Sequence, residues 1–378
     1  MSKTQPPSPG ELEVSVFGPG YGESVLVHVG YGAWVVIDSC IDPKTNRSAP
    51  LNYLESIGVV PESAIRLVVA SHWHADHVRG LHQLLSAATS AIFSCAESLA
   101  RNEFLTLAKI EAMEPGKIPL GPEELYRCLT TVRERAETSR GHQHKWAGPD
   151  RILWQTDKHA PVKIRITTLS PSDEMHSRTV QTMLNYITAV KKGLSEPRLI
   201  ATCPNDVAVA VLLEINERQI LLGSDLEQES NVAVGWSAVL AGEAVKDSKC
   251  CAFKVAHHGS YSGHSDAVWE ELLETSPLAL ITPFRHGDLR IPTGGDRARI
   301  LARTGDAYIS ADPNLSTKAP KKSGKVQAIM SNTIMNRRLA NGPMGHIRWR
   351  APINDPADRG LVELFDGALP LAVVSSAA

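Results

Sequence analysis

The sequence predicts an α/β protein whose strands and helices stack in layers. Short apolar runs typical of strands alternate with segments in which apolar residues recur at helical spacing. The strand-like runs fall into two groups, one early and one late in the chain. A chain of 378 residues with 43% hydrophobic content can also bury a sizeable core. We therefore expect one large domain with insertions.

The first group of predicted strands opens with a hairpin. Residues 12–17 and 24–29 are apolar or alternating, and Gly18-Pro19-Gly20 lies between them as a turn. Two further apolar runs, at residues 33–37 and 65–70, are typical of buried strands, and polar residues follow each of them directly. We expect the C-terminal ends of these strands to deliver polar side chains to one place.

A charged, helix-prone segment then interrupts the strands at about residues 97–150, and we interpret it as a helical insertion. The second group of strands follows it, with helices between the strands. The predicted strands are residues 151–154, 162–169, 207–214, 219–222, 253–256 and 278–281, and the predicted helices are residues 177–191 and 266–274.

Past Pro313 the composition shifts to Lys, Pro, Ser and Asn. We therefore assign residues 11–312 to the main domain and residues 313–378 to a basic C-terminal extension whose short strands pack on that domain. Part of this extension carries eight positive charges and no acidic residue: Lys318, Lys321, Lys322, Lys325, Arg337, Arg338, Arg348 and Arg350. Such a patch suits a nucleic-acid backbone, although a solvated tail would have the same composition.

The overall composition indicates a cytoplasmic protein. The formal charge is -2, so a polyanion site would have to be local. The six cysteines are scattered without CxxC pairs, as expected for reduced thiols. The polar N-terminus has no apolar signal-peptide stretch, and we expect no membrane association because no run of about 18 apolar residues occurs.

The segment most informative about chemistry is Ser71-His72-Trp73-His74-Ala75-Asp76-His77, which follows a predicted strand and precedes a predicted helix. Three imidazoles and a carboxylate stand within six positions. Alternation along an extended chain puts His72 and His74 on one side, while Asp76 and His77 begin the turn and can face a second ion. This spacing suits two neighbouring metal sites, and a chance cluster of histidines in a polar loop is the weaker interpretation.

The HxHxDH pattern resembles the signature of the metallo-β-lactamase superfamily, and the resemblance extends along residues 12 to 312. Three further segments resemble the branch that contains the competence protein ComEC: the opening Phe17-Gly18-Pro19-Gly20-Tyr21-Gly22-Glu23-Ser24 with Val36-Ile37-Asp38-Ser39, the segment Leu221-Leu222-Gly223-Ser224-Asp225-Leu226-Glu227, and the segment Lys254-Val255-Ala256-His257-His258-Gly259-Ser260. The resemblance implies an αββα sandwich, in which two mixed β-sheets are flanked by helices.

The resemblance also implies a ligand set for two divalent metal ions, Zn²⁺ or Mn²⁺. His72 and His74 would bind the first ion, Asp76 and His77 the second, and Asp225 would bridge them. Either His257 or His258 would complete the second site; we favour His258 because it directly precedes a glycine. Asp76, Asp225 and His258 are then expected to be essential for catalysis. Asp38 would orient the ligands from behind, since ligating histidines need hydrogen-bond acceptors.

One departure from the superfamily pattern concerns the first metal site. Most members have a further histidine about twenty residues before the bridging aspartate, and here Asn205 or Asp206 stands near that position. We expect Asn205 to lie beside the site. The first site would then hold its metal weakly or prefer Mn²⁺, which tolerates oxygen ligands. His142 or His144 could supply the missing ligand from the insertion, although both also suit ordinary surface positions.

A metal-bound water has a lowered pKa, so hydroxide is the expected nucleophile. Lys254, Ser260, Arg285 and His286 are candidates to bind a substrate phosphate. The first hypothesis is a phosphodiesterase, a nuclease acting on DNA. One alternative is an enzyme for a small phosphodiester, such as a cyclic nucleotide or a phosphorylcholine ester. Another is a metal-binding regulatory or scaffold subunit of an operon-encoded assembly, such as one for anti-phage defence. The sequence leaves the oligomeric state open.

Overall fold

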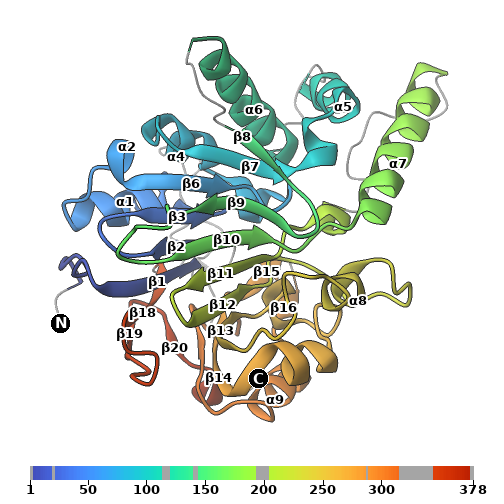
Figure 1. The fold of residues 1–378 in the computed structure, drawn as a ribbon. Helices are drawn as coiled ribbons and strands as arrows, with labels where there is room; N and C mark the ends of the chain where they lie inside the picture. Colours follow the sequence, from blue (N-terminus) through green and yellow to red (C-terminus); the bar gives the residue numbers. More distant parts are fainter. Residues whose placement is uncertain are drawn as a thin grey trace, which may run out of the picture.

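The computed structural model describes residues 3–18, 22–112, 120–138, 144–192, 204–286, 288–314 and 344–374. Figure 1 shows these residues arranged as two stacked β-sheets with helices on the outer sides. Each sheet has eight strands and mixes parallel with antiparallel pairs. The αββα architecture predicted from the sequence is therefore confirmed.

The first sheet is built mainly from the N-terminal half. β3, β6, β7 and β8 are parallel to one another, and the remaining pairs are antiparallel. Its strand order is β19 (Leu361–Phe365), β18 (Gly345–Pro352), β1 (Glu11–Gly18), β2 (Ser24–His28), β3 (Trp34–Ile37), β6 (Ile65–Val69), β7 (Ile92–Ala96) and β8 (His144–Ala147).

The second sheet repeats this arrangement with the later strands. β12, β13, β14 and β17 are parallel, and the pairs on either side of them are antiparallel. Its strand order is β20 (Leu369–Pro370), β17 (Ala307–Ile309), β14 (Leu273–Ile281), β13 (Cys250–Lys254), β12 (Arg218–Leu222), β11 (Val211–Ile215), β10 (Ile164–Thr168) and β9 (Arg151–Gln155).

Helices and two small hairpins complete the fold. The helices are α1 (Ala49–Ser56), α2 (Pro61–Ala64), α3 (Ala75–Val78), α4 (Leu81–Ala87), α5 (Asn102–Ala112), α6 (Leu120–Thr138), α7 (Asp173–Lys191), α8 (Gly235–Leu240) and α9 (Gly294–Leu301). The hairpins pair β4 (Ile41–Asp42) with β5 (Arg47–Ser48), and β15 (Phe284–His286) with β16 (Leu289–Ile291). No helix among the described residues is long and apolar enough to cross a membrane.

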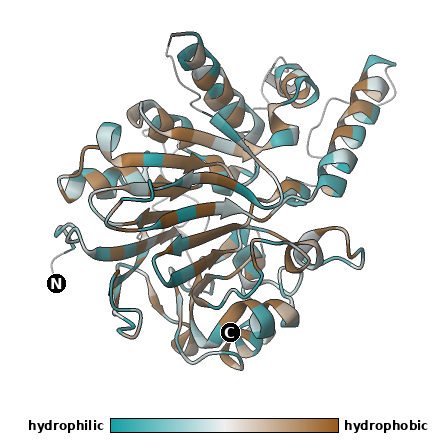
Figure 2. Ribbon diagram, in the orientation of Figure 1, coloured by the Kyte–Doolittle hydropathy of each residue, from teal (hydrophilic) through white to brown (hydrophobic). Residues whose placement is uncertain are grey.

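Alternation along the strands divides the core into two apolar clusters. In β12, Ile220 and Leu222 belong to the cluster shared with the first sheet, whereas Leu221 belongs to a second cluster with Trp236 of α8 and Ile300 of α9. This is the period of two expected for a strand covered on both faces. Figure 2 shows the same pattern, with apolar residues concentrated in the strands and hydrophilic residues common on the outer helices.

The C-terminal strands, predicted as short strands of an extension that packs on the main domain, are members of its two sheets. β18 pairs with β1 along its full length, and β20 pairs with β17 of the second sheet. β1 would otherwise present an unpaired edge to solvent.

The predicted basic patch is corrected in part, because Arg348 and Arg350 are buried and paired with Glu363 and Glu13. Its other six residues, between positions 318 and 338, lie outside the described residues.

The segment at residues 97–150 contains α5 and α6, as predicted, but it also contains strand β8 at the edge of the first sheet. α6 packs against α3 and α4. A Cβ atom on Gly121, in the first turn of α6, would lie 1.8 Å from the backbone oxygen of Trp73. The insertion is therefore in direct contact with the histidine-rich loop.

Candidate metal centre

The C-terminal ends of parallel strands from both sheets meet at one edge of the sandwich. β3 leads to Asp38, β6 to Ser71 and His72, and β12 to Ser224 and Asp225. β13 leads to the His257–His258 pair and β14 to Thr282. This edge of parallel strands is where α/β folds commonly bind ligands.

The histidine-rich loop after β6 provides four side chains that point toward one another. His72 and His77 are fully buried, and Asp76 is 5% exposed. Nε2 of His72 lies 3.0 Å from Nδ1 of His74. Nε2 of His77 lies 3.7 Å from Oδ2 of Asp76. α3 begins directly after His74, so the chain turns there and separates the two pairs.

Asp225 lies between these two pairs. Its Oδ2 is 3.8 Å from Nε2 of His72, and its Oδ1 is 3.4 Å from Nε2 of His77. Oδ2 is also 3.6 Å from Nε2 of His258. One carboxylate therefore faces three imidazoles, which is the arrangement that a bridging ligand requires.

The two adjacent histidines after β13 have different surroundings. Nε2 of His258 lies 3.3 Å from Oδ2 of Asp76, so His258 joins Asp76, His77 and Asp225. His257 instead has Nδ1 2.8 Å from Oε1 of Glu227 and Nε2 3.4 Å from Nδ2 of Asn205. The structure therefore distinguishes His258, which faces Asp76 and Asp225, from His257, which faces Glu227 and Asn205. The sequence alone could not distinguish them.

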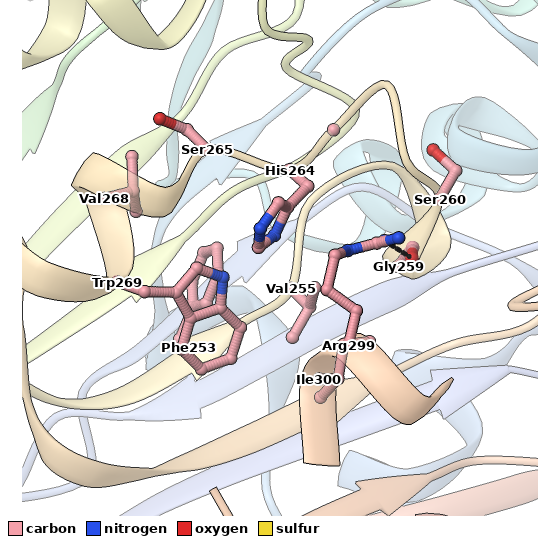
Figure 3. Close-up of a pocket in the computed structure, with 11 residues that line it drawn as sticks. Phe253, Val255, Gly259, Ser260, His264, Ser265, Val268, Trp269, Arg299 and Ile300 are labelled. Atoms are coloured by element: carbon pink, nitrogen blue, oxygen red, sulfur yellow. Dashed lines mark hydrogen bonds between the residues drawn. The ribbon is translucent and has the colours of Figure 1, made fainter. Parts of the chain in front are cut away.

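The backbone at this pair is strained. His257 and His258 both have positive φ angles, 47° and 55°, which side chains other than glycine rarely adopt. The backbone NH of His257 donates to the carbonyl of Ser224, and Arg299 donates to the carbonyl of Gly259 (Figure 3). Beneath this loop is a cavity of about 10 Å³ lined by His264, Trp269 and Arg299, which has room for at most one water.

The inward-facing histidines share one arrangement: Nδ1 contacts a polar group behind the ring, and Nε2 faces the carboxylates. Nδ1 of His77 lies 2.7 Å from Oδ2 of Asp38. Nδ1 of His72 is 3.0 Å from Oγ of Ser71, and Nδ1 of His258 is 3.2 Å from the carbonyl oxygen of Thr282. Asp38 also accepts hydrogen bonds from the backbone NH and the hydroxyl of Ser71. These partners fix the orientation of each ring.

The donor atoms fit a divalent cation. Among the described residues, Nε2 of His77, Oδ1 of Asp225 and Nε2 of His258 are buried without a hydrogen-bond partner. Buried polar atoms are normally paired, and imidazole nitrogens with carboxylate oxygens are common ligands of Zn²⁺ and Mn²⁺. Ligand atoms of His72, His77 and Asp225 lie within 4.8 Å of one another. The orphaned atoms and the donor chemistry therefore both agree with metal binding.

The electrostatics favour the protonation states that metal ligands need at Asp225 and His72 but not at His77. Burial alone would lower the pKa of His77, but the carboxylates of Asp225, Asp76 and Asp38 outweigh it and hold this pKa well above its usual value, so metal binding there would displace a proton. Burial alone would raise the pKa of Asp225, but the charges of His77 and His258 outweigh it and hold this pKa well below its usual range. Asp225 is thus ionised. Burial, with the neighbouring His77 and His74, holds the pKa of His72 well below its ordinary value. His72 is therefore neutral and can offer a lone pair.

Two residues at the site differ from what the sequence predicted. Lys254 was a candidate phosphate ligand, but its side chain is 1% exposed and its Nζ lies 2.7 Å from Oε2 of Glu23, so it cannot reach a substrate. Glu23 was not singled out from the sequence, although a charged residue directly before the apolar strand β2 was a signal of a functional role. The sequence does not reveal that β2 places this charge behind His258.

The remaining predicted residues lie around the centre. Ser260 is 9% exposed, and its hydroxyl is 3.2 Å from that of Ser262. Arg285 and His286 lie on β15, whose Phe284 ring is 5.3 Å from the ring of His258. Asn205 lies beside the centre, as expected, and donates to Glu227.

Two histidines of the insertion were the other candidates for the missing first-site ligand. His142 lies outside the described residues, and His144 is the first residue of β8. His144 packs its ring against Trp146 at 4.6 Å. Neither of the ligand groups found among the described residues includes His144.

One family model matches part of this chain. Residues 17–146 match the model of the metallo-beta-lactamase superfamily. No curated protein matches the chain.

Three of the solved structures that match this chain are the following. The metallo-beta-lactamase fold protein YhfI from Bacillus subtilis is 12% identical, with 79% of this chain and 95% of that chain covered and a TM-score of 0.36. MEM-A1, a subclass B3 metallo-beta-lactamase from a soil metagenome library, is 14% identical, with 68% and 83% covered and a TM-score of 0.33. The dizinc quorum-quenching lactonase AidC is 12% identical, with 54% and 55% covered and a TM-score of 0.29.

The family match contains the histidine-rich loop, and the fold brings that loop to Asp225 and His258. The chain therefore carries a metallo-β-lactamase superfamily domain with the buried donor set of a metal-dependent hydrolase.

Proposed function

We propose that the protein is a metal-dependent phosphodiesterase and that DNA is its substrate. The observation that supports this most directly is the position of Asp225 between two groups of ligands. A shared carboxylate holds two cations close together, and such a pair suits in-line displacement at phosphorus, because both the entering and the leaving oxygen need stabilisation.

The two positions would have different ligands. His72, His74 and Asp225 would hold the first cation, and Asp76, His77, Asp225 and His258 the second. When bound, the cations supply a lowered pKa for water and positive charge for the phosphate oxygens. The first set is smaller because Asn205 stands where most relatives have a histidine, and an amide offers an oxygen ligand at most. We expect weaker binding there, and Mn²⁺ to be accepted beside Zn²⁺.

Donors on the outer side of the centre would bind the substrate. The hairpin of β15 and β16 carries Arg285, which is half-buried, and His286, which is exposed. The ring of Phe284 on the same strand contacts His258, so this hairpin borders the second metal position. Ser260 follows the two histidines in the chain. An arginine fork and an imidazole are well suited to orient phosphate oxygens.

The choice of DNA rests on the resemblance of three segments to the ComEC branch. A different observation favours the second candidate, a small phosphodiester. The carboxylate of Glu227 lies beside His257, and burial, together with the charges of Glu229 and Glu227, raises the pKa of Asp206 to about 6. Carboxylates at this side of the centre would repel the many phosphates of a long polyanion more strongly than those of a short substrate.

Hydrolysis assays with the metal-loaded protein separate these candidates. Linear single- and double-stranded DNA, a cyclic dinucleotide and bis-p-nitrophenyl phosphate would be compared with added Mn²⁺ or Zn²⁺. DNA cleavage that weakens steeply with salt supports a nuclease, because each phosphate contact releases counterions. Cleavage of the small esters without DNA cleavage would select the second candidate instead.

Arg285→Ala tests the substrate side. We expect about a 10-fold to 100-fold loss of phosphodiester hydrolysis with unchanged metal content, the loss expected for one charged hydrogen bond. Arg66→Ala, at an exposed arginine of β6, is the matched control and should behave as the wild type. Equal activity of the two variants would remove Arg285 from the proposed site.

A further inference from the structure

Behind the metal centre, Glu23 and Lys254 form a buried ion pair. Nζ of Lys254 lies 2.7 Å from Oε2 of Glu23, and their side chains are 1% and 3% exposed. Lys254 also donates to the carbonyl of Val255. Ion pairs buried this deeply often contribute less to stability than apolar side chains of similar volume would. Stability alone therefore does not account for this pair.

Glu23 connects two of the three segments that carry the ligands of the second metal position. Its backbone NH donates to the carbonyl of Asp76 at 2.8 Å. Its Oε2 accepts from the hydroxyl of Thr282 and lies 3.5 Å from Nδ1 of His258. The carbonyl of Thr282 is 3.2 Å from the same Nδ1. Glu23 and Thr282 therefore enclose one edge of the His258 ring, and Nε2 on the opposite side faces Asp76.

We propose that the Glu23–Lys254 pair is a positioning device that holds His258 with Nε2 toward Asp76 and Asp225, and thereby sets the metal affinity of the second position. Carboxylates behind ligating histidines fix the ring and increase its basicity. Lys254 places a positive charge 2.7 Å from the Glu23 carboxylate, so the ion pair adds no net charge beside the cations. Asp38, which follows β3, takes the corresponding position behind the ring of His77.

A direct role for Glu23 as a ligand is the competing interpretation. A carboxylate oxygen of Glu23 lies within 4.8 Å of ligand atoms of His77 and His258. However, Oε2 is on the Nδ1 side of His258 and already contacts Lys254 and Thr282. Positioning predicts that Glu23 acts only through His258, whereas a ligand would act independently of it.

The test measures metal binding by the full chain, with isothermal titration of Zn²⁺ and elemental analysis. Glu23→Gln should weaken one of the two bound metals about 10-fold to 100-fold, the range seen when partners behind metal ligands are lost. An unpaired buried lysine could by itself impair folding of Glu23→Gln. The double variant Glu23→Gln/Lys254→Met removes both charges and avoids this, and we expect it to show the same loss of metal affinity. Circular dichroism verifies that each variant is folded.

The chain offers a matched control in Glu13, which is fully buried on β1 and paired with Arg350 at 2.7 Å. Glu13→Gln breaks a comparable ion pair away from the ligands and should leave metal affinity unchanged. Glu23→Gln would then be combined with His258→Ala. Positioning predicts no further loss in the double variant, because the two changes act on one contact. Additive losses, or a Glu23→Gln affinity equal to that of Glu13→Gln, would overturn the proposal.

This inference rests on the metal centre of the proposed function but not on its substrate, so the two can fail separately. A wild-type chain that binds metal as predicted but hydrolyses no phosphodiester would contradict the proposed function and leave the positioning role standing. A wild-type chain that binds no Zn²⁺ would contradict both.

Discussion

Nδ1 of His77 lies 2.7 Å from Oδ2 of Asp38, and both side chains are buried. Asp38 comes from the end of β3 and His77 from the turn after β6, so the contact joins two neighbouring parallel strands. It orients the ring with Nε2 toward Asp225. We therefore expect the metal centre to depend on Asp38, although Asp38 contacts His77 only at Nδ1, the ring nitrogen on the side away from the centre.

Asp38→Asn should weaken metal binding about 10-fold to 100-fold, because an amide cannot accept from His77 and from both groups of Ser71 at once. Asp38 has a φ of 60°, which asparagine tolerates, so the backbone should persist. Titration with Zn²⁺ measures the effect. Asp150→Asn is the control, since Asp150 also has a positive φ but binds the backbone NH groups of Glu243 and Ala244. Equal metal affinity in both variants would refute the orienting role of Asp38.

Protonation of His28 should lower the free energy of unfolding in acid. Burial, assisted by the charge of Arg350, lowers the pKa of His28 to about 4. The unfolded chain takes up this proton below about pH 6.5, whereas the folded chain does so only near pH 4. The free energy of unfolding therefore falls as the pH drops through this window, by about 3 kcal/mol at most.

The variant His28→Gln keeps a donor and an acceptor for Glu11 and Gly32 and removes this loss. Urea unfolding at pH 7 and pH 4.5 should show a smaller decrease for the variant than for the wild type. His159→Gln, at an exposed histidine, provides the baseline. Parallel decreases in all three proteins would show that His28 does not bind its proton differently on folding.

The packing of β18 should make Gly345 intolerant of any side chain. A Cβ atom there would lie 1.5 Å from the backbone oxygen of Ser310, and neither backbone can move without disturbing a sheet. Gly345→Ala should cost about 3 kcal/mol or more in the free energy of unfolding. Gly305→Ala, where nothing lies within 4 Å, is the control. A thermal midpoint for Gly345→Ala equal to that of the control would mean that β18 is not fixed in this place.

The architecture and the inner ligands could be predicted from the sequence because local spacing encodes them. The apolar runs predicted an α/β layer structure, and the resemblance to the metallo-β-lactamase superfamily implied its two sheets. His72, His74, Asp76 and His77 stand within one short loop. Strand β8, and the place of the C-terminal strands within the two sheets, were not predicted because their partner strands lie far away in sequence. β18 was assigned to an extension because the composition shifts past Pro313, and its arginines were counted in a basic patch, whereas in the sheet each of them is paired with a glutamate.

The choice between His257 and His258, and the roles of Glu23 and Lys254, depended on tertiary structure. Adjacent histidines look equivalent in a sequence, and the local backbone conformation decides which one faces Asp76. A lysine before a histidine pair suggests phosphate binding, but its partner Glu23 is 231 positions away, by subtraction of 23 from 254. Pairing across such a distance leaves no local pattern.

Metal-dependent hydrolysis of bis-p-nitrophenyl phosphate by the wild type and by Asp225→Asn, with metal content measured on the same samples, tests the central claim most directly. The structure places Asp225 within 4 Å of three ligand histidines, so its loss should affect both metal positions. We expect fewer metal ions per chain and at least about a 100-fold loss of activity, comparable to removing a principal electrostatic group from an active site. Full metal content with undiminished hydrolysis in Asp225→Asn would contradict a centre built around this aspartate.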